Sequence, residues 1–196
     1  DGIEALTMRR LAEEASVSSK TPYNLFDSKT HILFAIMLQT IEPLEHLDPP
    51  AERNLAMAEL LQRLEILLSL DAENEAFLRS VHWSIMRSDD MESKLQGRMM
   101  LDRLIAEHVD NAFEQGELKP DCDSRALTLH ISTLLAAILG MWADSQLSLH
   151  EAVSHTRHAW TNSLLPHARG KALRYLRENA GSSFLEEFPD TPERVA

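Results

Sequence analysis

Apolar residues recur at every third or fourth position through most of the chain, and this helical period constrains the fold more than any other feature. From about residue 55 to residue 165 the apolar positions keep a period near 3.6, with no alternation of the kind that marks a strand. Each stretch has an apolar and a polar side, so each must pack against its neighbours. We therefore predict an all-α protein.

Five helices are expected in this region. The first three have apolar faces made by Leu55, Leu60, Leu61, Leu64, Leu67 and Leu68, then by Phe77, Leu78, Val81, His82 and Ile85, and then by Leu95, Met99, Leu104, Ile105, Val109 and Phe113. Gly116, with Pro120 beyond it, is a stop signal for the third helix. The last two are expected at about 123–143 and 148–165, and the first of these is apolar on more than one side.

Composition narrows the class of protein. With 196 residues, 44% of them hydrophobic, the chain can build a core. We find no apolar run near the roughly 18 residues that cross a bilayer and no signal-peptide layout, so we expect a cytoplasmic protein with no membrane partner. The single cysteine, Cys122, is expected to be inert.

The first 45 residues contain two short helices and a longer one. Thr7 is placed to cap a helix to about Ala15, and Ser18 or Ser19 to cap a second one to about Phe26, with Val17 as a core plug between them. The third helix has one apolar side and ends at Pro43 and the Asp48-Pro49-Pro50 stretch. Its apolar side consists of Ile32, Leu33, Ile36, Met37, Thr40 and Ile41. We place a domain boundary here, with domains at 1–46 and 47–196.

A set of residues at fixed offsets carries a resemblance to a known family. The set is Thr7-Met8-Arg9-Arg10-Leu11-Ala12, Ala15-Ser16-Val17-Ser18, Thr21-Pro22-Tyr23-Asn24-Leu25-Phe26, Ser28-Lys29 and Ile32-Leu33. It resembles the helix-turn-helix signature of the tetracycline-repressor (TetR) family. The resemblance implies an N-terminal DNA-binding domain followed by a larger helical domain for ligand binding and dimerisation. It also implies that a first helix of the DNA-binding domain precedes Asp1.

The resemblance assigns roles on the DNA. Arg9, Ser19 and Lys20 are candidates for base contacts, since their groups suit base-edge acceptors. Candidates for phosphate contacts are Thr7, Thr21, Tyr23 and Lys29, and Ser18 and Asn24 complete the DNA-binding set. Structural roles remain open for three of them, because Thr7 is also a cap, Tyr23 a packing residue and Lys29 a surface charge. Leu11, Ala12, Val17 and Phe26 are interpreted as core.

Two residues depart from the family pattern, and the net charge is unusual for a DNA-binding protein. Ser16 stands where the family often has glycine, and Leu25 where it often has a phosphate-binding histidine. The net charge is −12, of which residues 1–33 contribute only −1. Because phosphate affinity comes from Lys and Arg, DNA binding must lie at the N-terminal end.

The apolar helix at 123–143 and the helix after it are expected to form a four-helix dimer interface with a second copy. The residues predicted for this homodimer interface are Leu127, Ile131, Leu134, Leu135, Ile138, Trp142, Val153, Thr156 and Trp160. The alternative is that these residues are buried within a single chain.

The resemblance also implies a ligand pocket in the larger domain. The candidates are Phe77, Trp83, Met86, Met99, Met100, Arg103 and Phe113, in which methionine and aromatic side chains make adaptable walls and Arg103 binds an anion. A core role is the alternative for each of them.

No signature of catalysis or metal binding is found. The sequence contains no nucleophile elbow, phosphate-binding glycine loop or zinc-deaminase pattern, so we predict neither an enzyme nor a cofactor. His155 and His158, with His150 nearby, lack the partners that would complete a metal site. The predicted function is a DNA-binding transcriptional regulator, a repressor that a small-molecule effector releases from a palindromic double-stranded operator. The alternative is an adaptor that keeps the fold but has lost DNA binding.

Overall fold

The computed structural model describes residues 3, 6–45, 55–70 and 74–179, except for the side chains of 40–45 and 64–70. Within these ranges the chain is helical and contains no strand, as predicted. The helices are α1 (Met8–Glu14), α2 (Thr21–Leu25), α3 (Lys29–Glu45), α4 (Ala56–Leu70), α5 (Glu75–Arg87), α6 (Met91–Glu114), α7 (Ser124–Ala143), α8 (Leu149–Leu164) and α9 (Gly170–Asn179). The predicted boundary near residue 47 lies outside the described residues.

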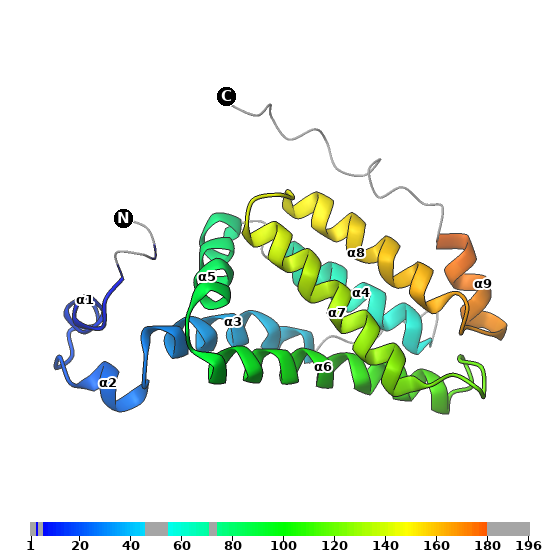
Figure 1. The fold of residues 1–196 in the computed structure, drawn as a ribbon, viewed down its shortest axis with the longest axis horizontal. Helices are drawn as coiled ribbons and strands as arrows, with labels where there is room; N and C mark the ends of the chain where they lie inside the picture. Colours follow the sequence, from blue (N-terminus) through cyan, green and yellow to red (C-terminus); the bar gives the residue numbers. More distant parts are fainter. Residues whose placement is uncertain (1–2, 4–5, 46–54, 71–73, 180–196) are drawn as a thin grey trace, which may run out of the picture.

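The helices form two regions (Figure 1). The short helices α1 and α2 pack on each other at one end of the molecule, and α4, α6, α7 and α8 run along the rest of it. Helix α3 packs against α4, α5 and α6, so it connects the two regions. Its start shares a small core with α5, in which Leu33 and Phe34 meet Val81 and Ile85.

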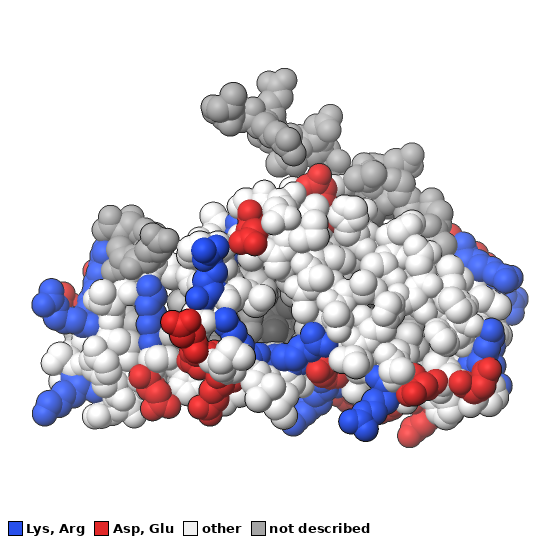
Figure 2. Space-filling model, viewed as in Figure 1, with Lys and Arg blue, Asp and Glu red and all other residues white. Residues whose placement is uncertain are grey.

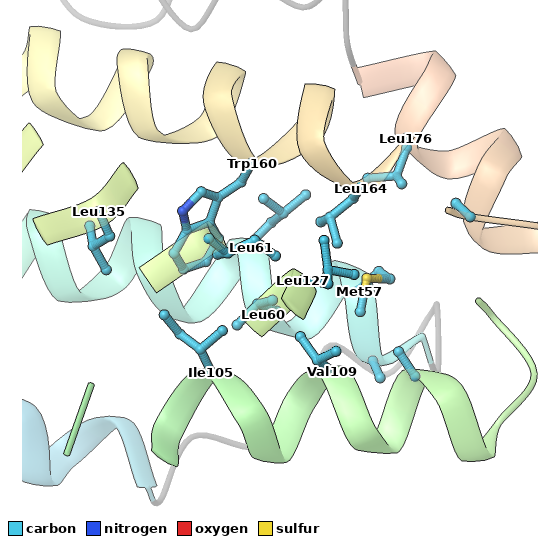
Figure 3. Packing of buried hydrophobic residues seen from close by; sticks show 14 of the residues in the cluster. Met57, Leu60, Leu61, Ile105, Val109, Leu127, Leu135, Trp160, Leu164 and Leu176 are labelled. Carbon is cyan, nitrogen blue, oxygen red and sulfur yellow. The ribbon is translucent and has the colours of Figure 1, made fainter. Parts of the chain in front are cut away.

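The main core lies inside the bundle. Trp160 of α8 is buried among side chains from α4, α6 and α7, and Leu164 and Leu176 continue this core toward α9 (Figure 3). The predicted faces of α4 and α5 are confirmed in part, since Leu60, Leu61, Leu78, Val81 and Ile85 are buried. Helix α7 packs along α6 and α8 in this bundle.

Helix α7 corrects the expectation that no apolar segment is long enough to cross a bilayer. Its residues Ser124–Ala143 are long and apolar enough, by length and composition, to cross a membrane, with a mean hydropathy of 1.7. Such a composition is also typical of a core helix, and Leu127, Ile131 and Leu135 are buried within the chain's own bundle.

The predicted face of α6 is wrong at three positions. Leu95 and Met99 are 60% and 57% exposed, and Phe113 is exposed as well. The buried residues of this helix are Ser93, Ile105, His108, Val109 and Ala112. Two of these are polar and satisfied locally, since Ser93 bonds to Asp90 and His108 Nδ1 lies 2.9 Å from the Leu104 carbonyl oxygen. Since Ile105 and Val109 are buried as predicted, hydrophobicity alone identified only part of the inward face.

Glu117 fixes the start of α4 from a distant part of the chain. Its two carboxylate oxygens accept hydrogen bonds from the backbone N–H groups of Ala56 (2.8 Å) and Met57 (3.0 Å), which have no partner inside the helix. Burial raises the pKa of Glu117, and the two N–H bonds oppose that effect. No signal in the sequence indicated this remote cap.

Candidate DNA-binding surface and internal cavity

Helix α1 begins and ends with specific local bonds. The Thr7 hydroxyl accepts a hydrogen bond from the Arg10 N–H at 3.2 Å, so the predicted cap is confirmed. At the other end Ser16 has a φ of +54°, and the N–H groups of Ser16 and Val17 bond to the carbonyls of Glu13 and Ala12. This is a Schellman motif, in which glycine is the favoured residue at the left-handed position.

The turn between α1 and α2 differs from the prediction in two respects. The residue that caps α2 is Lys20, with no side-chain hydrogen bond, and the Ser18 hydroxyl instead lies 2.8 Å from that of Thr21. Val17 is 43% exposed and therefore is not a core plug. The reason is that the nearby core is built between α3 and α5 and does not reach this turn.

Helix α3 also differs from the prediction at its end. It continues through Pro43 to Glu45, so Pro43 does not terminate it. At its start Ser28 accepts a hydrogen bond from the His31 N–H at 3.1 Å and caps the helix.

Most of the predicted DNA-binding residues lie together on the surface of α1, α2 and the turn between them. The exposed ones are Thr7, Arg9, Ser18, Ser19, Lys20, Tyr23 and Asn24, and Thr21 is half-buried beside them. Lys29 is also half-buried, and its Nζ donates a hydrogen bond to the Ile3 carbonyl at 2.6 Å. The structure thus gives Lys29 a partner within the chain, a contact that the sequence did not indicate.

Basic side chains project from this end of the molecule (Figure 2). Arg9 is highly exposed and forms a 3.5 Å ion pair with Glu13, which is also exposed, an interaction of small energy in water. Leu25, at the end of α2, is 70% exposed, although it is apolar. A protein surface with exposed cations, hydroxyls and one phenol suits a phosphate backbone and base edges.

A cavity of about 330 Å³ lies where α3, α5, α6 and α7 meet, and the surface is hollowed there in Figure 2. Its walls are mainly apolar. They consist of Phe34, Met37, Leu78, Val81, Ile85, Met86, Gly97, Met100, Leu101, Leu104, Ala136, Leu139 and Trp142, with four polar side chains, His82, Ser93, Lys94 and Arg98. Its volume and lining are typical of a small-molecule site.

Only two of the predicted ligand residues line this cavity, Met86 and Met100. The others, Phe77, Trp83, Met99, Arg103 and Phe113, lie outside its lining. The arginine in the lining is Arg98, which is five positions before Arg103 and therefore about 140° away around α6. The sequence identified the helices correctly but not their inward faces.

The polar groups of the cavity differ in how they are held. Arg98 donates through Nε to Asp102 at 2.9 Å and through Nη2 to the hydroxyls of Ser132 and Thr133 at 2.9 and 3.0 Å. His82 lies against Trp142, with ring centroids 6.2 Å apart. Burial lowers the pKa of His82, so its imidazole is uncharged at neutral pH and has both a donor and an acceptor.

An arginine clamp holds one wall of the cavity. Arg79 of α5 donates to the carbonyls of Trp142 (2.5 Å) and Leu147 (3.2 Å), forms an ion pair with Glu75, and lies 5.2 Å from the centroid of the Trp142 ring. The Trp142 indole N–H donates in turn to Glu75 at 3.1 Å. These bonds attach the end of α7 to α5 and fix the position of Trp142.

Two helix caps are bonded to each other between the cavity and the N-terminal region. Asp90 caps α6 by accepting from the Ser93 N–H (3.0 Å) and hydroxyl (2.8 Å), and it also accepts from Ser28, the cap of α3, at 3.3 Å. The bonds from Ser93, then that from Ser28 and the nearby His31, lower the pKa of Asp90 against partial burial. The associated stability is present above the pKa of the unfolded chain and is lost as the pH falls through the folded-state value.

The predicted dimer residues are mostly inside the chain. Leu127, Ile131, Leu135, Trp142, Val153, Thr156 and Trp160 are buried, so they are not available to a second copy, and Leu134 and Ile138 are half-buried. The exposed apolar residues of α7 are Leu129 and Met141, with Ala137 on the same helix. Because α7 is apolar on more than one side, its period could not show which side faces inward.

Within the described residues there is no group of three or more His, Cys, Asp or Glu side chains that could hold a metal ion. His155 and His158 are exposed on α8. Cys122 is buried, and burial, with the neighbouring Asp123 and Asp121, raises the pKa of its thiol. The thiol therefore stays protonated and unreactive.

Residues 1–36 match the family described as "Bacterial regulatory proteins, tetR family". The matched segment covers α1, α2 and the first half of α3. Neither the curated proteins nor the solved structures gave a match to this chain.

Proposed function

We propose, from the match of residues 1–36 to the tetR family of bacterial regulatory proteins, that the chain is a ligand-released repressor of that family. It is a DNA-binding transcription regulator, with α1 and α2 as its helix-turn-helix. In the proposed cycle a homodimer binds a palindromic operator in the cytoplasm, and a small molecule in the cavity releases it. Arg9, Ser19 and Lys20 are the proposed base contacts, and Thr7, Thr21 and Tyr23 the proposed phosphate contacts.

The observation that carries this proposal is the shared wall of the cavity. Phe34 and Met37 of α3 line the cavity, and α3 follows the proposed recognition helix α2 after only Phe26, Asp27 and Ser28. Gly97 of α6 allows the close approach, since a Cβ atom there would lie 3.0 Å from the Phe34 ring. A ligand that occupies the cavity would therefore contact α3, the helix that follows the proposed recognition helix.

The hydrogen bond between the helix caps Ser28 and Asp90 supplies a second connection between the cavity and α3. Ser93 lines the cavity and bonds to Asp90, and Asp90 bonds to Ser28 at the start of α3. Displacement of the first turn of α6 by a ligand is thus transmitted to the first turn of α3. We propose that the ligand shifts the population toward a state in which two recognition helices no longer fit successive major grooves.

The proposed dimer uses α7 and α8, with the exposed side chains replacing those predicted from the sequence. Leu129, Ala137 and Met141 give α7 an accessible apolar side. Two copies of α7 and α8 related by a twofold axis would bury it in a four-helix interface. A dimer is also what presents two recognition helices one helical turn of DNA apart.

The first test is selection of bound duplexes from a random library at a stated salt concentration, followed by measurement of affinity for the selected sequence. We expect a palindrome. Failure to enrich any sequence would favour the adaptor that has lost DNA binding.

A substitution sharpens this test. Arg9→Ala removes an exposed guanidinium and should weaken specific binding by about 1 to 3 kcal/mol if Arg9 contacts a base. The matched control is Arg87→Ala, an exposed arginine at the end of α5, which should leave DNA affinity unchanged. An equal loss of affinity for selected and random DNA would indicate that Arg9 contacts a phosphate and not a base.

Release requires that the ligand bind the free protein more tightly than the operator-bound protein, because coupling between two sites is reciprocal. Titration of an effector into free and operator-bound protein measures the difference. Equal affinities would refute release by population shift.

A further inference from the structure

The polar and apolar linings of the cavity are separated along α6. Ser93, Lys94 and Arg98 come from its first two turns, whereas Met100, Leu101 and Leu104 come from the turns that follow. The lined part of the helix, from Ser93 to Leu104, is about 16 Å long at 1.5 Å per residue. The part of the lining that α6 supplies therefore has its two cations toward the start of the helix and its apolar side chains farther along it.

The charge of the cavity is opposite to that of the protein. The chain carries a net charge of −12, yet the described lining residues include two cations and no Asp or Glu. The Asp102 carboxylate bonds to Nε of Arg98 but is not part of the lining. A cationic ligand would meet no counter-charge on these walls, and an anionic one would meet two.

The two cations are not equivalent. Arg98 is already fixed by Asp102, Ser132 and Thr133. The Lys94 ammonium is half-buried, and within the described part of the chain it forms no hydrogen bond or ion pair. An ammonium has three donors, so Lys94 has the larger unused capacity to bind an anion.

From this asymmetry we infer that the cavity binds an amphipathic organic monoanion, such as a medium-chain carboxylate, with its apolar body along α6 and its anionic head on Lys94. This inference names the effector class for the site proposed above and rests on that proposed function. A volume of about 330 Å³ is at the small end of ligand pockets, which favours a single chain or ring system over a larger conjugate.

The test compares three probes that share a ten-carbon chain. Decanoate, decanol and decyltrimethylammonium are titrated into the full chain by calorimetry, the two ionic probes below their micellar concentrations and decanol below its solubility limit. Charge-assisted hydrogen bonds in a partly buried site make decanoate bind about tenfold or more tightly than decanol, with the cation weakest. Equal affinities for decanoate and decanol, preference for the cation, or no binding of decanoate would each overturn the inference.

Variants locate the head group. Lys94→Gln should reduce decanoate affinity about tenfold and leave decanol affinity unchanged, and Lys94→Met should do the same without adding a polar group. Arg103→Gln removes a cation from the same helix outside the lining, and it should retain the affinity of the unaltered chain. Circular dichroism checks that each variant is folded. Equal losses in the Lys94 and Arg103 variants would contradict the assignment of Lys94.

Failure of this inference and failure of the proposed function give different results. If decanoate binds as described but no duplex is enriched, the ligand class stands and the regulator proposal fails. If a palindrome is bound and another compound releases it while decanoate does not bind, the regulator proposal stands and the ligand class is wrong.

Discussion

The N-terminal helices and the bundle are stabilised to different extents. Helices α1 and α2 bury only Met8, Ala12 and Pro22, and they leave Tyr23 and Leu25 facing solvent. In the bundle α4, α6, α7 and α8 enclose a continuous core, which includes Trp160. Most side chains of α1 and α2 are therefore not needed for packing and are accessible to DNA. Those of the bundle form the core and line the cavity.

The largest expected effect is in the bundle. Glu117→Ala removes the acceptors of two buried N–H groups at the start of α4 and should lower the free energy of unfolding by about 2 to 4 kcal/mol. Urea denaturation followed by circular dichroism measures the change. Glu117→Gln keeps one acceptor and should lose less.

Glu114→Ala is the matched control for Glu117, because Glu114 is exposed at the end of α6. It should change stability by less than about 0.5 kcal/mol, as surface substitutions usually do. If Glu117→Ala proved as stable as Glu114→Ala, the remote cap would not hold α4, and the contrast between the two regions would weaken.

The contrast between the N-terminal helices and the bundle also explains which features could be predicted from the sequence. The helix-turn-helix was identified from residue types at fixed offsets, because short capped helices joined by a tight turn constrain individual positions such as Thr7, the cap of α1. The bundle helices were predicted from their period, and the two whose bounds were predicted, at 123–143 and 148–165, agree with α7 (Ser124–Ala143) and α8 (Leu149–Leu164). Their inward faces were predicted only in part: Ile105 and Val109 of α6 are buried as predicted, but His108 is also buried, with a local partner.

Predicting which residues line the cavity required knowing those inward faces, so the lining was predicted only in part. Met86 and Met100 line it, but Arg98 does so instead of Arg103. On α7 an apolar surface on more than one side gave no basis for choosing between core and interface, and Leu135 was assigned to the interface although it is buried. Long-range bonds, such as Ser28 to Asp90, join residues 62 positions apart and have no sequence signal.

A smaller effect is expected from two serines in left-handed turns, one in each region. Ser16 follows α1 with a φ of +54°, Ser145 follows α7 with a φ of +58°, and glycine relieves the steric cost of this conformation. After the entropy that glycine adds to the unfolded chain, each substitution should stabilise by about 0.5 to 1 kcal/mol.

The two substitutions differ in where the gain is measured. Ser145→Gly should raise the free energy of global unfolding, because Ser145 joins two bundle helices. Ser16→Gly should instead slow hydrogen exchange of the α1 amides, because a thinly packed region opens on its own. If Ser16→Gly raised global stability as much as Ser145→Gly, the N-terminal helices would unfold together with the bundle.

The smallest expected effect concerns the exposed Leu25. Since its side chain is 70% exposed, replacement by histidine costs little packing and adds a donor beside Tyr23 on the proposed DNA-binding surface. Leu25→His should tighten operator binding by about threefold at pH 6, where the imidazole is largely protonated, and by less at pH 8. The slope of affinity against salt should also steepen at pH 6, because an added cation releases counterions from the DNA. Leu25→Ala, the control, should leave both quantities unchanged, because an exposed leucine supplies no phosphate contact. A histidine variant that binds no better than the alanine variant at pH 6 would mean that this end of α2 faces away from the phosphate backbone.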